Sequence, residues 1–108
     1  MREIDILKIK KMCHNKTLRW TNHVVVRLLQ RGISMEYVES ALLSGEIIEQ
    51  YPEDYPYPSC LLLGMDKTDK PLHIVCGVSD IELWLITTYY PDQEEWEPNF
   101  KTRKGSAK

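Results

Sequence analysis

The spacing of apolar residues along the chain changes once, near Gly45, from a helical period to the alternation typical of strands. Before that glycine, the apolar positions predict helices over residues 3–15, 21–31 and 34–44. After it, short apolar runs separated by Pro-rich or polar turns predict strands over residues 46–51, 60–65, 72–78 and 81–90. The chain is therefore expected to place its helices first and its sheet second.

The second and third predicted helices carry local start and stop signals. The side chain of Thr21 or Asn22 can accept a hydrogen bond from the first turn of the second helix, and Gly32 ends that helix. Ser34 caps the third helix in the same way, and Gly45 ends it. The expected buried stripes are Val25, Leu28 and Leu29 in the second helix, and Val38, Ala41 and Leu42 in the third.

The connections between the predicted strands are short, which favours an antiparallel meander of four strands. Because the helices are segregated from the strands, we expect an α+β fold, a two-layer sandwich with N-terminal helices packed on a four-stranded antiparallel sheet. After the last strand, Asp92 and Glu95 resemble a capping pair for a final helical turn that holds Trp96.

Charge is distributed unevenly along the chain, although the net charge is only −2. Residues 1–20 hold six Lys or Arg against two carboxylates, and residues 101–108 hold four cations and no carboxylate. Residues 21–100 hold four cations against fourteen carboxylates, and such an acidic middle repels a phosphate backbone. Any RNA contact would depend on the basic ends and on Arg27 and Arg31, although basic ends can also serve solubility alone.

Several protein classes are excluded by the same sequence. No apolar run approaches the roughly 20 residues of a membrane-spanning helix, and Leu61-Leu62-Leu63 is far too short. The first residues lack the order of a secretory signal peptide, so we expect a cytoplasmic protein. Cys13, Cys60 and Cys76 form no C-x-x-C pair and are expected to be free thiols. We expect no zinc finger, no metal site and no cofactor.

Two groups of side chains could carry chemistry. His23, Arg27 and Arg31 are four residues apart, so they form one stripe along the second helix, where guanidinium groups could bind phosphate. His73 lies on the strand face opposite Leu72, and its imidazole could act as a general acid or base. The alternatives are a solvated helix face paired with acidic neighbours, and a hydrogen-bonded structural histidine.

Tyrosines gather near the Pro-rich loop and at the end of the last predicted strand. Tyrosines that border a groove could stack on unpaired bases, and packing in the core is the alternative. The candidate RNA-binding residues are Tyr57, near the loop, and Lys101 and Arg103, in the basic C-terminal stretch.

An ordered set of short motifs resembles the small bacterial proteins of the domain-of-unknown-function 4258 family. The set includes Trp20-Thr21-Asn22-His23, Arg31-Gly32-Ile33-Ser34, Pro71-Leu72-His73-Ile74-Val75, Tyr90-Pro91-Asp92 and Trp96-Glu97-Pro98. The resemblance spans residues 18–104, and it divides the chain into three parts. These are an N-terminal extension, 1–17, expected to be helical, a single α+β domain, 18–104, and a basic tail, 105–108.

This resemblance implies a toxin-like fold similar to bacterial messenger-RNA interferases of the RelE and MqsR type. It also implies a cognate antitoxin as partner, for which a zinc-finger protein is one form, and metal-independent cleavage of single-stranded RNA. In that mapping His23 or His73 transfers the proton, Arg27 and Arg31 neutralise the charge of the transition state, and Tyr90 orients the scissile phosphate.

The alternative is a non-catalytic protein-binding module with the same fold. The two hypotheses differ in a geometric expectation. An endoribonuclease should bring His23, Arg27, Arg31 and His73 together in one concave pocket, whereas structural residues have no reason to meet there.

Overall fold

Three helices and five strands make up the part of the chain that the computed structural model describes, residues 3–105. The helices are α1 (Ile6–His14), α2 (Asn22–Arg31) and α3 (Met35–Ser44). The strands are β1 (Leu18–Trp20), β2 (Glu46–Tyr51), β3 (Ser59–Met65), β4 (Pro71–Val78) and β5 (Leu83–Tyr89). Within residues 3–105, no helix is long and apolar enough to cross a membrane. The predicted basic tail lies outside the described residues except for Gly105.

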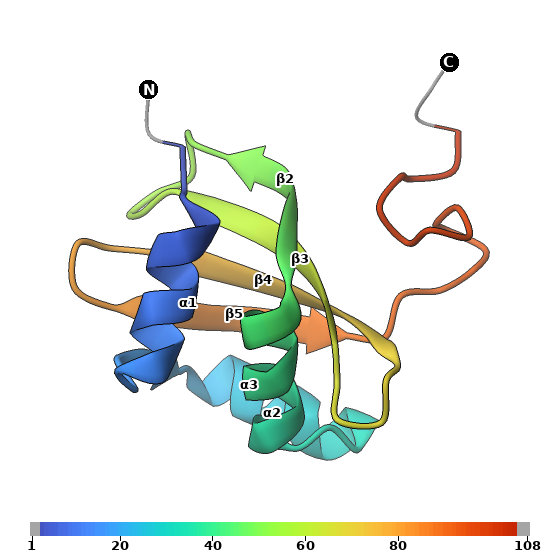
Figure 1. The fold of residues 1–108 in the computed structure, drawn as a ribbon, viewed down its shortest axis with the longest axis horizontal. Helices are drawn as coiled ribbons and strands as arrows, with labels where there is room; N and C mark the ends of the chain where they lie inside the picture. Colours follow the sequence, from blue (N-terminus) through green and yellow to red (C-terminus); the bar gives the residue numbers. More distant parts are fainter. Residues whose placement is uncertain (1–2, 106–108) are drawn as a thin grey trace.

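The strands form one open sheet in the order β1-β5-β4-β3-β2, as the ribbon in Figure 1 shows. The predicted α+β class and the predicted meander are both present, because β2, β3, β4 and β5 pair antiparallel in sequence order. The prediction of four strands was incomplete, since β1 adds a fifth strand parallel to β5. A strand of three residues is too short to show an alternating period in the sequence.

The predicted caps set where α2 and α3 begin. Thr21 is the N-cap of α2, and its side chain accepts a hydrogen bond from the backbone N–H of Val24 at 3.2 Å. Ser34 does the same for Tyr37 at the start of α3, at 3.1 Å. Gly32 ends α2 with a φ of 66°, in the left-handed region that glycine adopts most easily.

The buried stripe of α2 differs from the prediction. Val24 and Leu28 are buried, Val25 is half-buried, and Leu29 is 80% exposed. Leu29 follows Leu28 by one residue, which is a rotation of about 100° around the helix, so the two cannot share one face. In α3 the prediction is confirmed, because all three residues of the expected stripe are buried.

The main core lies between the helices and one face of the sheet. Side chains alternate along each strand, so Leu72, Ile74 and Cys76 join this core while His73 points to the opposite face. In Figure 1, α1 and α3 cross the sheet and α2 lies beside β5. Ile9 of α1 is fully buried in the same core, so the N-terminal extension packs as part of the fold. The three cysteines are free thiols, as predicted, and all three are buried.

We call the sheet face opposite the helices the open face. The segment after β5, residues 91–105, crosses one end of it. The segment starts with the predicted turn, in which the Asp92 carbonyl accepts hydrogen bonds from the N–H groups of Glu95 and Trp96, each at 3.0 Å. Trp96 is only 2% exposed, and a short backbone bridge joins it to Arg103. The segment therefore folds back so that Arg103 lies beside the sheet.

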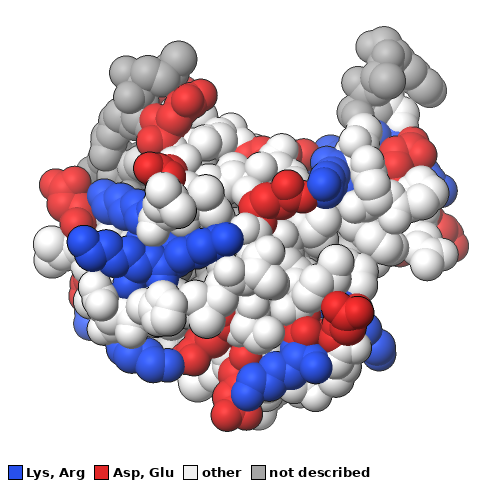
Figure 2. All heavy atoms as spheres, viewed as in Figure 1, with Lys and Arg blue, Asp and Glu red and all other residues white. Residues whose placement is uncertain are grey.

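The two basic ends of the chain lie on different parts of the molecule. Lys and Arg side chains gather over α1 on the face drawn in Figure 2, and Lys8 and Lys11 are exposed on that helix. Two basic residues of segment 91–105, Lys101 and Arg103, instead pair with carboxylates of β2. Lys101 contacts Glu46 at 2.6 Å.

Candidate functional site

The predicted His23, Arg27 and Arg31 stripe lies along α2, outside the core. His23 is exposed, and Nη1 of Arg27 donates to Oε1 of Gln30 at 2.9 Å. Nη1 of Arg31 donates to the backbone carbonyl of Thr88 on β5 at 2.6 Å. Arg31 therefore anchors the end of α2 to the sheet in this structure.

His73 lies on the open face and is fully buried beneath segment 91–105. Its Nε2 lies 2.7 Å from the carbonyl oxygen of Phe100, and its Nδ1 lies 3.4 Å from Oη of Tyr89. The ring of Trp96 meets the imidazole edge-on, with centroids 4.4 Å apart. Burial lowers the pKa of His73, so the imidazole is neutral at pH 7. Its contacts hold segment 91–105 on the sheet.

Within residues 3–105, no hydrogen bond joins His73 to a residue of the α2 stripe. The α2 stripe belongs to the helix layer, which packs on the face lined by Leu72 and Ile74, whereas His73 points to the other face. Arg31 nevertheless reaches the end of β5. Burial raises the pKa of Tyr89 and the charge of Arg31 opposes this shift, and Oη of Tyr89 lies 3.4 Å from Nδ1 of His73. Alternation along β4 predicted that His73 lies on the face opposite Leu72, but no local pattern shows how the α2 stripe lies relative to that face.

Tyr90, expected to orient a phosphate, ties the chain after β5 to the turn between β3 and β4. Its Oη donates to Oδ2 of Asp66 at 2.6 Å. Burial and this hydrogen bond raise the pKa of Tyr90 to about 12. Asp66 is 3% exposed and also accepts backbone hydrogen bonds from Thr68 at 2.8 Å and Lys70 at 3.0 Å. In this structure the phenol of Tyr90 is thus one of the hydrogen-bond donors that satisfy the buried carboxylate of Asp66.

A cluster that the sequence did not reveal stands on the open face, formed by Glu49, Tyr51 and Arg103. We call it the Glu49 cluster. Nε of Arg103 donates to Oε2 of Glu49 at 2.8 Å, and Nη2 donates to Oε1 at 3.2 Å. Oη of Tyr51 also donates to Oε1 of Glu49. The guanidinium lies over the ring of Trp96, 4.7 Å from its centroid. The side chains of Arg103 and Glu49 are 52% and 24% exposed, so solvent reaches the cluster.

The three groups of the Glu49 cluster set one another's protonation states. Hydrogen bonding to Arg103 lowers the pKa of Glu49, although burial opposes the shift. Burial and the bond to Glu49 raise the pKa of Tyr51 to about 12. The same carboxylate raises the pKa of the Arg103 guanidinium. At neutral pH the cluster therefore presents a carboxylate, a protonated phenol and a guanidinium, which can accept a proton, donate a proton and bind an anion.

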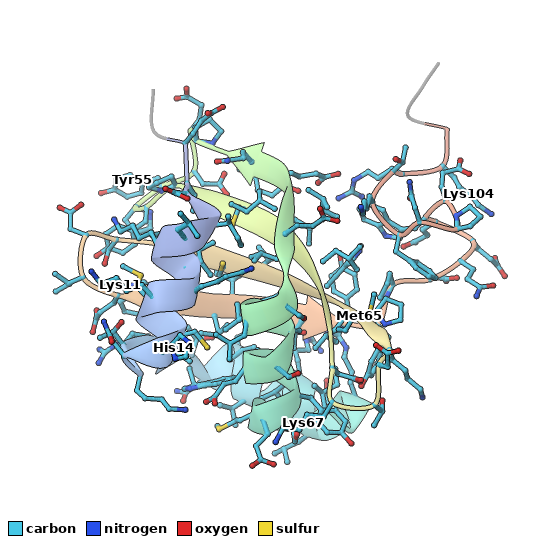
Figure 3. All side chains as sticks on the ribbon, viewed as in Figure 1. Lys11, His14, Tyr55, Met65, Lys67 and Lys104 are labelled. Atoms are coloured by element: carbon cyan, nitrogen blue, oxygen red, sulfur yellow. The ribbon has the colours of Figure 1, made fainter. Side chains whose placement is uncertain are left out.

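Two features of the sequence bring these side chains together. Glu49 and Tyr51 are two residues apart in β2, so the alternation of a strand puts both on one face. That spacing was a signal available from the sequence. Arg103 comes from 54 residues further along the chain, and only the path of segment 91–105 returns it to β2. Lys104 projects from the same segment in Figure 3.

The predicted RNA-binding residues all lie on or beside the open face. The ring of Tyr57 stacks near that of Trp84, with centroids 6.1 Å apart. Lys101 and Arg103 form ion pairs with Glu46 and Glu49. Their cations are thus partly neutralised by β2 when no RNA is bound.

No three His, Cys, Asp or Glu side chains within residues 3–105 are grouped so that they could hold a metal ion.

Comparison with known families gives one match. A family model described as "Domain of unknown function (DUF4258)" matches residues 20–90, about two thirds of the chain. The match includes Glu49, Tyr51 and His73 and ends before segment 91–105, so Arg103 lies outside it. The comparisons found no matching curated protein and no matching solved structure.

Proposed function

The chain belongs to the domain-of-unknown-function 4258 family, and we propose that it is a toxin of a toxin–antitoxin pair that cleaves single-stranded RNA without a metal ion. The reaction takes place in the cytoplasm, on the open face, at the Glu49 cluster. One observation carries the proposal. A carboxylate, a phenol and a guanidinium from two distant segments meet, within reach of solvent, on the sheet face opposite the helices.

In the proposed reaction, ionised Glu49 accepts the proton of a ribose 2′-hydroxyl, and the 2′ oxygen attacks the adjacent phosphorus. Arg103 turns from Glu49 to the phosphate and neutralises the charge of the pentavalent species. The bond from phosphorus to the 5′ oxygen breaks, and Tyr51 gives its proton to that oxygen. The products carry a 2′,3′-cyclic phosphate and a 5′-hydroxyl. Tyr51 regains a proton from Glu49, to which it is hydrogen-bonded.

His73 acts in this proposal as a positioning residue. It holds the carbonyl of Phe100, three residues before Arg103, at 2.7 Å. The imidazole thereby fixes the segment that carries the guanidinium. His23, Arg27 and Tyr90 take no part in the chemical step. Support for the likeness to RelE and MqsR interferases comes from the α+β architecture, in which helices cover one sheet face and leave the other for substrate.

The test is a cleavage assay with the purified chain and a single-stranded RNA in the presence of EDTA, with 2′,3′-cyclic phosphate ends as the readout. We expect Glu49→Gln and Arg103→Ala each to lower the rate by about 100-fold, because each removes a group that acts in the transition state. The matched control is Glu39→Gln. Glu39 is 27% exposed and pairs with Lys16 at 2.9 Å on the helix side, so it resembles Glu49 in exposure and charge pairing.

Three outcomes would contradict the proposal at different levels. Equal rates for Glu49→Gln and Glu39→Gln would move the reaction away from the Glu49 cluster. A large loss of cleavage rate in His23→Ala would indicate that the reaction takes place at the α2 stripe instead. Absence of cleavage by the parent chain on every RNA tested would remove the nuclease function altogether.

A second candidate function, a non-catalytic protein-binding module, is favoured by one observation on α2. Leu29 is 80% exposed and Val26 is 49% exposed, one helical turn apart. A partner protein that covered these two side chains would remove their apolar surface from water. In the toxin proposal the antitoxin binds this surface. The two functions therefore differ in whether activity requires the Glu49 cluster.

A further inference from the structure

The open face also contains an apolar cavity of about 380 Å³. Its lining includes Tyr55, Tyr57, Gly77, Trp84 and Ile86, and we call it the Trp84 cavity. We propose that this cavity holds an unpaired base of the RNA that the Glu49 cluster cleaves. The proposal rests on the proposed function and names the part of the substrate that is recognised away from the reacting phosphate.

Two aromatic rings give the cavity flat walls. The rings of Trp84 and Tyr57 are 24° from parallel, with centroids 6.1 Å apart. Gly77 is the cross-strand partner of Trp84, so no side chain stands on the sheet beside the indole at that point. Within residues 3–105, Nε1 of Trp84 is buried without a hydrogen-bond partner. The indole can therefore shift toward a stacked base without breaking a hydrogen bond.

The size and polarity of the cavity fit a single ring system. Its volume lies near the lower end of the range of about 300–1,000 Å³ for small-molecule pockets. Its lining is mostly apolar, and the hydroxyl of Thr21 already donates to the carbonyl of Leu85 at 3.0 Å. Few polar groups remain to read the edge of a base, whereas every base offers a face for stacking. The cavity is thus expected to accept all four bases.

A cation stands beside the aromatic walls. The guanidinium carbon of Arg19 lies 5.2 Å from the centroid of the Trp84 ring. Arg19 also pairs with Glu82 at 3.5 Å, and its side chain is 56% exposed. An exposed ion pair of this kind is weak, so Arg19 can turn to the phosphate of a nucleotide whose base stacks on Trp84.

The Trp84 cavity and the Glu49 cluster are connected by one row of the sheet. Cross-strand pairing aligns Tyr51, Ser59, Gly77, Trp84 and Arg19, one residue from each of the five strands. Tyr51 and Trp84 are three strand spacings apart, about 14 Å. Ser59 and Gly77 between them are buried, and the hydroxyl of Ser59 donates to the carboxylate of Asp54, so RNA would pass above this part of the row. Arg19 stands at one end of the row, and Arg103 lies beside the other end, where it shares Glu49 with Tyr51. A strand of RNA laid along the row would place a base in the cavity a few nucleotides from the reacting phosphate.

An aromatic or aliphatic side chain of a partner protein is the other class of occupant for an apolar cavity. The base is favoured because a phosphate chain needs cations at intervals, and Arg19 and Arg103 supply them at one end of the row and beside the other. The tyrosine at the rim, Tyr55, is 94% exposed and projects from the loop between β2 and β3 in Figure 3. Its ring adds a further stacking surface for an adjacent base.

The experiment measures binding of 2′-O-methyl RNA, which cannot be cleaved, to the full chain at one fixed salt concentration. Fluorescence anisotropy compares a base-bearing strand with an abasic strand of equal length. We expect the parent to bind the base-bearing strand at least fivefold more tightly, the lower limit for the loss of one stacking contact. Tyr57→Ala is expected to remove most of this preference, and Tyr57→Phe, which keeps the ring, is expected to restore it.

A second variant and a control protect the test against loss of folding. Gly77→Ala adds a Cβ whose nearest neighbours would be 3.6–3.9 Å away, so it fits the fold while narrowing the cavity, and it should also reduce the preference. Ile81→Ala, at an exposed site outside the cavity, should leave the preference unchanged. Circular dichroism of every variant checks the fold.

The outcomes separate this proposal from the proposed function. Equal affinity of the parent for both strands, or no binding to either, overturns the base proposal and leaves a protein side chain as the occupant, whatever the cleavage assay shows. A preference that depends on Tyr57, found in a chain that cleaves no RNA, supports the cavity and removes the nuclease function. Cleavage of RNA by a chain that shows no base preference supports the nuclease function and overturns the base proposal for the cavity.

Discussion

The Glu49 carboxylate is shared between Arg103 and Tyr51 and is 24% exposed. Opposing effects act on its pKa, the largest of them from Arg103 and from burial. Hydrogen bonding to the guanidinium stabilises the ionised form, while burial favours the protonated form. Since the first effect is larger, Glu49 is ionised over the whole neutral range and is available to accept a proton.

This balance leads to a pH prediction for cleavage. In the parent, kcat/KM should stay constant as the pH falls, and should decline only below the usual carboxyl pKa of about 4.3, because the pKa of Glu49 is lowered. Arg103→Gln removes the largest of the effects that lower the pKa of Glu49 and leaves mainly the hydrogen bond from Tyr51 to oppose burial, so the pKa of Glu49 rises. The remaining activity of this variant should therefore be lost at a higher pH than in the parent. The measurement is the pH profile of kcat/KM for both proteins.

The same profile has an alkaline side. Because the pKa of Tyr51 is about 12, its phenol stays protonated to high pH and the parent should show no loss of kcat/KM near pH 8–9 from this group.

The acid side of the profile tests the assignment of Glu49. A midpoint of the acid decline that is identical in the parent and in Arg103→Gln would contradict the assignment of Glu49 as the base.

At the scale of secondary-structure elements, α3 lies directly on β3 at Gly64. A Cβ placed on Gly64 would be 1.9 Å from the carbonyl oxygen of Ala41 and 2.8 Å from its Cα. These are backbone atoms of α3, which cannot move aside as a flexible side chain can. The absence of a side chain at Gly64 therefore allows the helix layer to approach the sheet.

Substitution of this glycine gives a stability prediction. Gly64→Ala is expected to destabilise the fold by about 3 kcal/mol or more, at the upper end for overpacking, because α3 must move off the sheet. The matched variant is Gly77→Ala, whose added Cβ makes only ordinary contacts, and which should change the free energy of unfolding by less than about 1 kcal/mol. Urea unfolding followed by circular dichroism measures both. Equal stability of the two variants would contradict the close contact.

Element boundaries could be predicted where a local residue determines them. Thr21, Ser34 and Gly32 act through hydrogen bonds or backbone angles within a few residues, so α2 and α3 were found in the sequence. β1 could not be found, because it forms only through pairing with β5, more than 60 residues away. The exposure of Leu29 was missed because two adjacent leucines give no sign of which one faces the sheet.

The candidate site was predictable only in part, for the same reason. Alternation along β4 correctly separated His73 from Leu72 and Ile74. Nothing local indicated that Trp96 would cover the imidazole, or that Arg103 would return to Glu49. Contacts made by an irregular segment such as 91–105 depend on its whole path, and no periodic pattern encodes that path.

The whole molecule has two sides that suit different partners. The helix side carries exposed apolar residues of α2, and the open face carries the Glu49 cluster and the Trp84 cavity. The toxin proposal assigns RNA to the open face and the antitoxin to a protein-binding surface. The binding-module alternative needs only the surface on α2.

Expression in bacteria distinguishes these assignments. Production of the parent chain should arrest growth, because messenger RNA is cut. Glu49→Gln should relieve the arrest, while Leu29→Ser and Glu39→Gln should leave it unchanged. The measurement is the growth rate after induction, at equal protein levels. Relief by Leu29→Ser but not by Glu49→Gln would instead support growth arrest through capture of a protein partner.

The contact between Arg31 and Thr88 has a consequence for self-association. β5 continues past the last residue of β1, so within the described chain residues 86–89 have no strand partner on that side of the sheet. Bare margins recruit strands from other molecules and can seed fibrils. The guanidinium of Arg31 donates a hydrogen bond to the Thr88 carbonyl. It also places a positive charge where an incoming strand would have to pair. We therefore expect Arg31 to disfavour the pairing of a second copy along this margin.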